Sequence, residues 1–499
     1  MKYDPDIRSR LIPLKSLDIE KCKTVGKTVE QMENCAIGAR MVGEAARTVT
    51  NWLEAGKQPR IIFDNPHPRD KFLNATVESF ALRLHPGIIN GPNPINSEFY
   101  AKYDGRNPVI VLGGFQHAHE DWLFERGEDE AIFINDINQT PPWVRGGHYK
   151  GFVNADPRLV VPLLYMVFLE RIQGEVGKSL SLIDSWGKCG GVGLEAAHGF
   201  DVFRRMVQDP EYTVIGAFSG ILTMAQMGGL ISRLIDKCRI NAVVSTGALI
   251  GHGLVEGLGL KHFKHNPCFS DKQLAAQKGN RIYDTIEWEE NLDFAEEIIR
   301  KVLEEMFQAS SQNIILSPSW VNYKIGQYLD KHYAGYESIL RSAYHGNIPV
   351  FIPAFWDSEV GNDFEVFNRR RLLEGLGRVA VDPGLDNEKL INMALNSKKL
   401  AIFSLGAGVP FNWTRNVAPL IEIMSQRLNL NLPEVRYTMT CRVCPDREFL
   451  GHLSGSTDEE GESWRKNLFS SNNFAHVHVD STVVFPVWMA AMEELQSAV

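Results

Sequence analysis

The sequence predicts an α/β fold: a Rossmann-like, mostly parallel β-sheet with helices on both of its faces, together with an inserted α+β segment. From residue 212 onward, short and nearly continuous apolar runs alternate with stretches of helical periodicity. Strands that are buried on both faces have this apolar character. Of the 499 residues, 44% are hydrophobic and 23% are charged, which suffices to bury a sheet of this kind.

The chain begins with a predicted helical segment, residues 16–56. Its apolar residues recur near the helical period, at Val29, Met32, Ala36, Ala39 and Val42. Gly56 marks the expected end of this segment. We therefore expect residues 1–57 to form an N-terminal helical part of the main domain.

Residues 58–210 have a different character. Prolines, glycines, asparagines and histidines interrupt short apolar runs such as PVIVLGGF and VVPLLYMVF. We predict that this segment is an insertion, and its sequence does not indicate what it does.

Six strand patterns follow within residues 211–499: YTVIGAFSG, NAVVSTGA, IPVFIPAFWD, KKLAIFSLGAG, EVRYTMTC and FAHVHVDST. Helical patterns separate most of them, the clearest being NLDFAEEIIRKVLEEMF. In parallel sheets of this type, ligands bind beyond the carboxyl ends of the strands. Those ends carry Ser219, Thr246, Asp357, Gly406 and Asp480.

Three of the turns, GAFSG, STGALIGHG and SLGAG, follow a strand and precede a predicted helix. Backbone N–H groups in such turns can bind phosphate oxygens. None of them matches the G-x-G-x-x-G fingerprint, and a single turn of this kind is more often simple strand-to-helix geometry. Three turns at equivalent places favour a phosphate-binding role.

The net charge of -9 argues against nucleic acid as a partner, because nucleic-acid binding usually needs a basic face. A small cationic substrate suits this charge better. The N-terminus lacks the apolar core of a signal peptide, and no stretch approaches the roughly 18 apolar residues of a membrane span. We expect a cytoplasmic protein without a membrane partner, whose seven cysteines are reduced.

The segment LSGSTDEEGESWRKNLF carries the main candidate for covalent chemistry. Lys466 lies two residues after Trp464 and six after Glu460. A lysine becomes nucleophilic when its ammonium group loses its proton, and desolvation beside an indole lowers its pKa. Taken alone, the segment also fits a solvated, charged helix start with one buried tryptophan.

Several blocks of the chain resemble the deoxyhypusine synthase family in collinear order. They are the helical segment ending near Leu53, YTVIGAFSG, VVSTGALIGHGLVEGLG, SILRSAYHGNIPVFIPAFWDSEVG, SLGAGVP, LSGSTDEEGESWRK and HVHVDSTVVFP. The resemblance covers residues 16–56 and 212–492, and the family's block around the lysine normally reads SWGK. Such an ordered series is more specific than any single motif.

The resemblance implies that residues 211–499 form an NAD-binding catalytic domain. In the family, NAD removes a hydride from the carbon beside a polyamine's secondary nitrogen, and a lysine captures the imine. An aminobutyl group then passes to an acceptor amine. The resemblance makes Lys466 this lysine, and implies a tetramer with sites shared between subunits.

The same resemblance implies the binding residues, and it implies no metal. Those placed at NAD are Ser219, Gly220, Thr223, Thr246, Gly247, Ala248, Asp357, Gly406, Ala407, Asp446, Ser454, Asp480 and Ser481. Those placed at a polyamine such as spermidine are Glu460, Trp464, Asn362, Gly451, His452, His252 and Asn412.

The chain departs from the family in this pocket. Asn412 stands where the eukaryotic enzymes have a histidine that transfers protons, and an amide is no general base at neutral pH. His252, Leu450 and Leu453 stand where acids grip spermidine. Four alternatives stay open: transfer to a protein lysine, transfer to a free diamine giving homospermidine, a catalytically silent NAD-binding homologue, and a separate activity in residues 58–210. The lost acids favour the small-molecule acceptor.

Three other motifs are further candidates for catalytic or metal-binding residues. SLIDSWGKCGG carries a closer copy of SWGK with Lys188, but its flanks do not follow the family's order, so we prefer Lys466. FQHAHEDW holds His117 and His119, which without a further ligand cluster favour a polar loop over a metal site. Cys441 and Cys444 lack a second pair at zinc spacing and fit reduced, buried thiols.

Overall fold

The structure, a computed structural model, describes residues 7–57, 59–64, 108–113, 130–135, 151–237, 239–307, 312–406, 408–450 and 456–497. Its main sheet has six strands in the order β11-β6-β5-β13-β14-β15, and every neighbouring pair is parallel. The strands are β5 (Tyr212–Phe218), β6 (Ala242–Val244), β11 (Val350–Phe351), β13 (Lys399–Leu405), β14 (Tyr437–Val443) and β15 (Phe474–Val477). Each of the six strand patterns in the sequence supplies one of them, which confirms the predicted fold class.

Helices cover both faces of this sheet, and β13 shows why its sequence is apolar throughout. Ala401 and Phe403 belong to a hydrophobic cluster that includes side chains of α8 (Gly191–Gln208) and α21 (Ser481–Ser497). Leu400 and Ile402 belong to a second cluster, which includes side chains of α17 (Gly384–Leu395), α18 (Val409–Arg415) and α19 (Val417–Arg427). Because successive residues of a strand point to opposite faces, the two clusters are the two sides of the sheet.

The strand order reverses between β5 and β13. From β5 the chain adds β6 and β11 on one side, and then β13, β14 and β15 on the other. Open α/β sheets bind their ligands at such a switch point, beyond the carboxyl ends of the two central strands.

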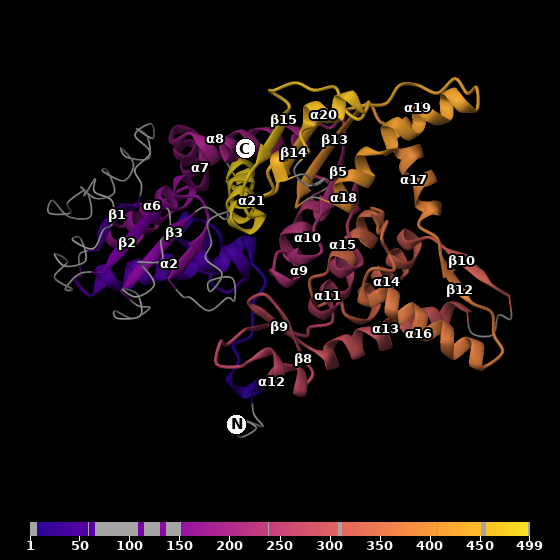
Figure 1. Cartoon of the computed structure of the whole chain (residues 1–499), viewed down its shortest axis with the longest axis horizontal. Coiled ribbons are helices and arrows are strands. Elements are labelled where there is room, and N and C mark those ends of the chain that lie inside the picture. The colour runs from indigo at the N-terminus through magenta and orange to yellow at the C-terminus, as the bar shows by residue number, and fades with distance from the viewer. Residues whose placement is uncertain are drawn as a thin grey trace.

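The remaining helices extend well beyond the main sheet, on more than one side of it (Figure 1). At the N-terminus they are η1 (Arg8–Arg10), η2 (Ile19–Lys21), α1 (Val25–Met32) and α2 (Ile37–Glu54). Between β5 and β13 they are α9 (Ile221–Met224), α10 (Gly228–Asp236), α11 (Gly247–Gly257), α12 (Asp271–Ala276), α13 (Glu289–Phe307), α14 (Pro318–His332), α15 (Ile339–Gly346) and α16 (Glu359–Leu373). Two short ones follow β14, η5 (Glu448–Leu450) and α20 (Asp458–Ser463).

Two small sheets lie between β6 and β13 in the chain. One is antiparallel in the order β7-β9-β8 and the other is a parallel pair, β10-β12. Their strands are β7 (Phe263–Lys264), β8 (Gly279–Ile282), β9 (Thr285–Trp288), β10 (Ile314–Leu316) and β12 (Val379–Val381).

A further parallel sheet of four strands, in the order β1-β2-β3-β4, lies in the segment that the sequence predicts to be an insertion. Its elements are β1 (Arg60–Asp64), β2 (Val109–Gly113), β3 (Ala131–Asn135), β4 (Phe152–Asn154), α6 (Pro157–Gln173) and α7 (Ser179–Cys189). This sheet lies to one side of the main sheet in Figure 1. The helix α8, which ends the same segment, packs against β5, β14 and β15 of the main sheet.

None of the described helices is long and apolar enough to cross a membrane. The six cysteines among the described residues carry no disulfide. Burial raises the pKa of the Cys441 thiol above its ordinary range and that of Cys444 to about 11. Both therefore stay protonated at neutral pH, as inert buried thiols do. FQHAHEDW lies outside the described residues.

Candidate active site

The turns after β5, β6 and β13 meet at the carboxyl edge of the main sheet. The N–H of Ser219 donates to the carbonyl of Leu405, the last residue of β13, over 2.9 Å. Gly220 lies so close to the β6 turn that a Cβ atom there would collide with Oγ1 of Thr246 and would lie 2.8 Å from Cβ of Ala248. The structure thus brings together residues that are up to 187 positions apart, 219 to 406.

Gly406 lies at the switch point, and both its conformation and its surroundings require glycine. Its φ is +89°, which L side chains rarely adopt, and a Cβ atom would lie 2.7 Å from Cβ of Ser219. Its N–H donates to the carbonyl of Val443, at the end of β14, over 2.8 Å. Bare backbone at a switch point is the arrangement with which dinucleotide folds approach a pyrophosphate.

The turn with Asp357 reaches the same edge. A Cβ atom on Gly247 would collide with Oγ of Ser358, which accepts from the N–H of Gly361 at the start of α16 over 3.2 Å. Asp357 and Asn362 are both exposed there. Their side chains therefore stay open to a ligand in solution.

Asp480 and Ser481 follow β15 where α21 begins. One carboxylate oxygen of Asp480 accepts from the N–H and the hydroxyl of Thr482, over 2.8 and 2.7 Å, and burial raises the pKa of the carboxyl group. Asp446 follows β14 and accepts from the thiol of Cys444 over 3.6 Å. Both acids lie near the carboxyl edge, and Asp480 also caps α21.

Two predicted site residues are buried. Thr223 lies 3.2 Å from a Cβ atom built on Gly253 of α11, and its hydroxyl donates to the carbonyl of Gly220 over 3.5 Å. His252 is also buried, against Glu287. Four more are outside the described residues: Ala407, Gly451, His452 and Ser454.

The backbone of Lys466 is fixed by its neighbours. Its N–H donates to the carbonyl of Gly461 over 2.9 Å, and its carbonyl accepts from the N–H of Tyr437, the first residue of β14, over 3.0 Å. The side-chain amide of Asn467 donates to the carbonyl of Asp458 over 2.9 Å. A short helix, α20, and the main sheet therefore hold the lysine in place.

The Lys466 amine reaches α18 and is half-buried. Nζ donates to Oδ1 of Asn412 over 2.9 Å. Burial lowers the pKa of this lysine, and the charge of Arg415 lowers it further. Both effects disfavour the ammonium form, because burial removes water from a charge and Arg415 repels it. Asn412 is one turn from Gly408, to whose carbonyl its N–H donates over 3.0 Å. The amine thus lies along the helix that begins at the Gly406 turn.

Arg415 belongs to a buried charge cluster that the sequence did not reveal. Its guanidinium lies 3.2 Å from a carboxylate oxygen of Asp458, and both side chains are buried. Arg442, also buried, donates to Nδ1 of His476 over 2.9 Å and lies 4.9 Å from the ring of Phe411. No periodicity signals this cluster, since its members come from α18, α20 and β14.

The acid and the indole near Lys466 are exposed in this single chain. Glu460 accepts from the N–H of Thr457 over 2.6 Å, while the Thr457 hydroxyl accepts from the N–H of Glu460, which together form a capping box for α20. Trp464 is 70% exposed. Their roles beside a polyamine stay predictions.

The competing lysine has a different environment. Lys188 extends from α7 into solvent and pairs there with Asp184, one turn earlier. Trp186 points the other way, into the core, and donates to the carbonyl of Leu159 over 2.9 Å. The SWGK motif of this segment therefore consists of a buried structural tryptophan and a lysine that extends into solvent.

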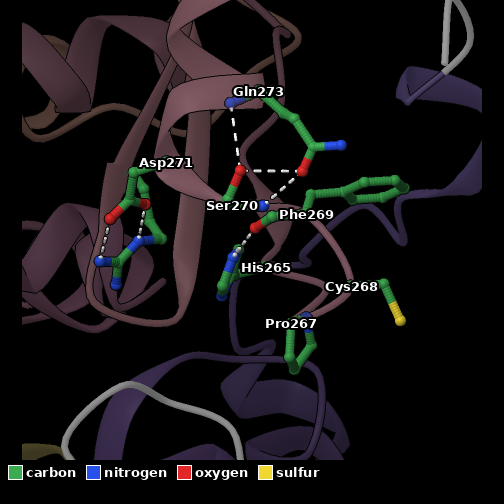
Figure 2. A pocket seen from close by; sticks show the side chains of 8 residues that line it. His265, Pro267, Cys268, Phe269, Ser270, Asp271 and Gln273 are labelled. Atoms are coloured by element: carbon green, nitrogen blue, oxygen red, sulfur yellow. Dashed lines mark hydrogen bonds and ion pairs between the residues drawn. The ribbon is translucent and has the colours of Figure 1, made fainter. Parts of the chain in front are cut away.

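A pocket of about 470 Å³ lies far along the chain from these residues, at the start of α12 (Figure 2). Four of its polar side chains interact with one another in two pairs. Ser270 and Gln273 form a capping box, and Arg281 donates to Asp271 over 2.8 Å. Of the predicted site residues that the structure describes, none lines this pocket.

The sequence model of the family described as deoxyhypusine synthase matches residues 181–492, more than half of the chain. The chain belongs to the deoxyhypusine synthase family. This confirms the resemblance drawn from the sequence blocks, and the match begins within the segment predicted to be an insertion. The family supports aminobutyl transfer as the general type of reaction.

Curated relatives agree with this assignment. "Probable deoxyhypusine synthase 2" of Methanosarcina acetivorans is 29% identical over 313 residues, which cover 63% of this chain and 86% of the relative. "Deoxyhypusine synthase-like protein" of Elusimicrobium minutum is 28% identical over 293 residues, 58% of this chain and 74% of the relative.

Proposed function

We propose that this member of the deoxyhypusine synthase family is an NAD-dependent transferase that moves an aminoalkyl group from a polyamine such as spermidine to an acceptor amine, and that Lys466 carries the group as an imine. The observation that best supports this proposal is the environment of the Lys466 amine. It is half-buried, its pKa is lowered by burial and by Arg415, and its hydrogen-bond acceptor is a neutral amide. A lysine must be uncharged to act as a nucleophile.

The carboxyl edge fits NAD. Gly406 and Gly220 present bare backbone where a Cβ atom would fill the space, and they do so at the switch point of the sheet. Asp357 is exposed at the same edge, and Asp480 has a second oxygen free of the Thr482 contacts. When bound there, NAD supplies hydride acceptance from the donor carbon.

The residues of the chain then divide the exchange into two imine transfers. Nζ of Lys466 forms a bond to the imine carbon, and the bond from that carbon to the donor's own nitrogen breaks, so that the remaining amine leaves with the proton that Nζ loses. Asn412 holds Nζ through its oxygen and takes no proton. The acceptor amine reverses these steps at the same carbon and frees Lys466, and that carbon then takes the hydride back, so that the product is an amine and the cofactor returns to its oxidised form.

The acceptor that we favour is a free diamine, which would give homospermidine. His252, Leu450 and Leu453 replace acids of the family's polyamine pocket, which reduces its negative charge. A protein lysine is the other acceptor to test. A catalytically silent NAD-binding homologue is the outcome if no amine is transferred.

Trapping of the imine tests the proposal. The protein is incubated with NAD and spermidine or another polyamine, reduced with borohydride, digested and analysed by mass spectrometry. We expect one stable aminobutyl group on Lys466, absent in Lys466→Ala. Lys188→Ala is the matched control, because Lys188 has the closer SWGK motif but is solvated. It should label as the unmodified protein does.

Absence of an adduct with every polyamine, or an adduct on Lys188 alone, would overturn the proposal. Adding putrescine or a lysine-bearing protein before the borohydride separates the two acceptors. The true acceptor should lower the amount of trapped adduct on Lys466 by about tenfold or more, because a positioned amine reacts far faster than a free one.

A further inference from the structure

Three buried side chains gather beneath the β6 turn. His252 belongs to α11, His262 directly precedes β7, and Glu287 belongs to β9. Their exposed fractions are 6%, 1% and 0%. Each offers one nitrogen or oxygen atom, and these atoms all lie within 4.8 Å of one another. Side chains that meet this closely in a protein core need a partner for every charge and lone pair.

Two of these atoms face each other without a hydrogen bond. Nε2 of His262 lies at an ion-pair distance of 3.2 Å from Oε1 of Glu287, yet neither atom has a partner with hydrogen-bond geometry among the described residues. In a tetrahedral zinc site, bonds of about 2.0–2.1 Å place neighbouring ligand atoms about 3.3 Å apart. The two atoms therefore have the spacing of ligands to a shared ion. The other oxygen of Glu287 forms a hydrogen bond of 2.5 Å with Nδ1 of His252, and binding of an ion by this nitrogen would replace that hydrogen bond.

The remaining nitrogen of His262 is oriented by a buried amide. Nδ1 lies 3.2 Å from the amide end of Gln226, which is itself buried. The amide nitrogen of Gln226 is the atom that faces Nδ1, and it also donates to the carbonyls of Thr223 and Met224 over 3.4 and 3.5 Å. Binding of an ion at Nε2 would move the ring proton to Nδ1 and turn the amide oxygen toward it. Metal-bound histidines have such a partner on their second nitrogen in most known sites.

We propose that His252, His262 and Glu287 bind one divalent transition-metal ion of the zinc class, with a fourth position left for water. Two imidazoles and one carboxylate form a ligand set that zinc accepts, and three protein ligands are typical of zinc sites that keep an open position. The sequence led us to expect no metal, since the ligands are dispersed over α11, the start of β7 and β9. The ion would join the small antiparallel sheet to α11, the helix that begins at Thr246.

Metal content and spectroscopy test this site without reference to amine transfer. The full-length protein is stripped with a chelator, given one equivalent of Zn²⁺ or Co²⁺, and passed over a desalting column. We expect about one ion per chain by elemental analysis, and with Co²⁺ the visible absorption of a low-symmetry, four-coordinate site. Zn²⁺ should also raise the melting temperature of the stripped protein.

Conservative variants separate binding from folding. Glu287→Gln keeps the shape of the side chain but removes its charge, and His262→Ala removes a ligand; each should retain less than about a tenth of the ion. Gln226→Leu should weaken the affinity by about 10–100-fold. The matched control is His345→Ala, which removes an exposed histidine paired with Asp330 over 2.7 Å and should leave the metal content unchanged.

Two results would overturn the site. One is a wild-type protein that retains no Zn²⁺ or Co²⁺ from a stoichiometric mixture. The other is an ion whose retention depends on His345 and is indifferent to Glu287→Gln in a folded variant, as judged by circular dichroism. Neither result bears on Lys466, whose imine trapping is measured separately.

Discussion

The amine of Lys466 donates to Asn412, whose amide carries no charge that would stabilise the ammonium form. Burial and Arg415 lower the pKa of the amine without opposition from this partner. An acid at the same place would act against them, because an opposite charge within about 4–6 Å stabilises the charged form. The neutral amide is thus a condition for a nucleophilic lysine, even though it cannot serve as the family's proton-transferring histidine.

Asn412→Asp should therefore move the pH dependence of imine formation to higher pH. The reactive form of Lys466 is the unprotonated one, so the rate rises as pH increases through its pKa. A carboxylate 2.9 Å away raises that pKa, and the midpoint should shift upward by about one pH unit or more. The measurement is the rate of the borohydride-trapped adduct between pH 6 and 10, values that span roughly the range of shifted and ordinary lysines. Asn416→Asp, an exposed change four residues later, should leave the midpoint in place.

For single residues, the sequence predicts which side chains belong to the candidate site better than it predicts which of them are in contact. The order of family-like blocks singled out Lys466 and Asn412, and the structure places the two side chains in a hydrogen bond. The pairing of Arg415 with Asp458 was not predicted, because it joins elements 43 residues apart that share no period. His262 and Glu287 were missed for the same reason.

The apolar runs of the sequence predicted the strands of the main sheet, but they did not predict the order of these strands in the sheet. The strands β5 and β13 are both continuous in apolar residues, since both are buried on both faces, and this is what made them visible. That they are neighbours depends on long-range pairing, which the local sequence does not encode. Only their adjacency brings Ser219 and Gly406 to one edge of the sheet, where we propose that NAD binds.

Gly406→Ala tests the function of that edge. A methyl group there would lie 2.7 Å from Cβ of Ser219 and would force φ of +89° on an L residue. We expect NAD binding to weaken by about tenfold or more, measured by calorimetry or by nucleotide fluorescence on mixing with NADH. Gly375→Ala is the matched control: its φ is +73°, but none of the residues that the structure describes lies within 4 Å of its added Cβ atom.

The Gly375→Ala control separates the effect of backbone strain from the effect of filling the space beside Ser219. Both alanines should lower stability by about 1–2 kcal/mol, since each residue must adopt the left-handed conformation. Gly375→Ala should still bind the nucleotide normally. Equal loss of binding in both variants would mean that strain, not the room beside Ser219, decides the result.

For the molecule as a whole, the segment 58–210 was the least predictable part. The family match begins at residue 181, and α8 packs its small and apolar face on the main sheet: a Cβ atom on Gly199 would lie 2.6 Å from Val477. The helical period of α8 is present in the sequence, but its local sequence does not indicate which sheet the helix covers. The domain boundaries that we placed at 57 and 210 stay predictions.

The last prediction concerns assembly. Trp464 and Leu468 lie two residues to either side of Lys466 and are 70% and 52% exposed in the single chain. At the reaction site that we propose, large apolar side chains would normally be covered. A tetramer with sites shared between subunits, which the resemblance implies, would cover them. Light scattering should then give a multiple of the 56.1 kDa chain. Leu468→Glu should weaken the assembly by about tenfold or more and reduce adduct formation on Lys466 with it, because a buried unpaired charge costs several kcal/mol. Leu373→Glu, at an apolar position that is 89% exposed at the end of α16, should change neither. A monomer that labels Lys466 at full rate would show instead that one chain holds a complete site and that the exposed indole has no part in it.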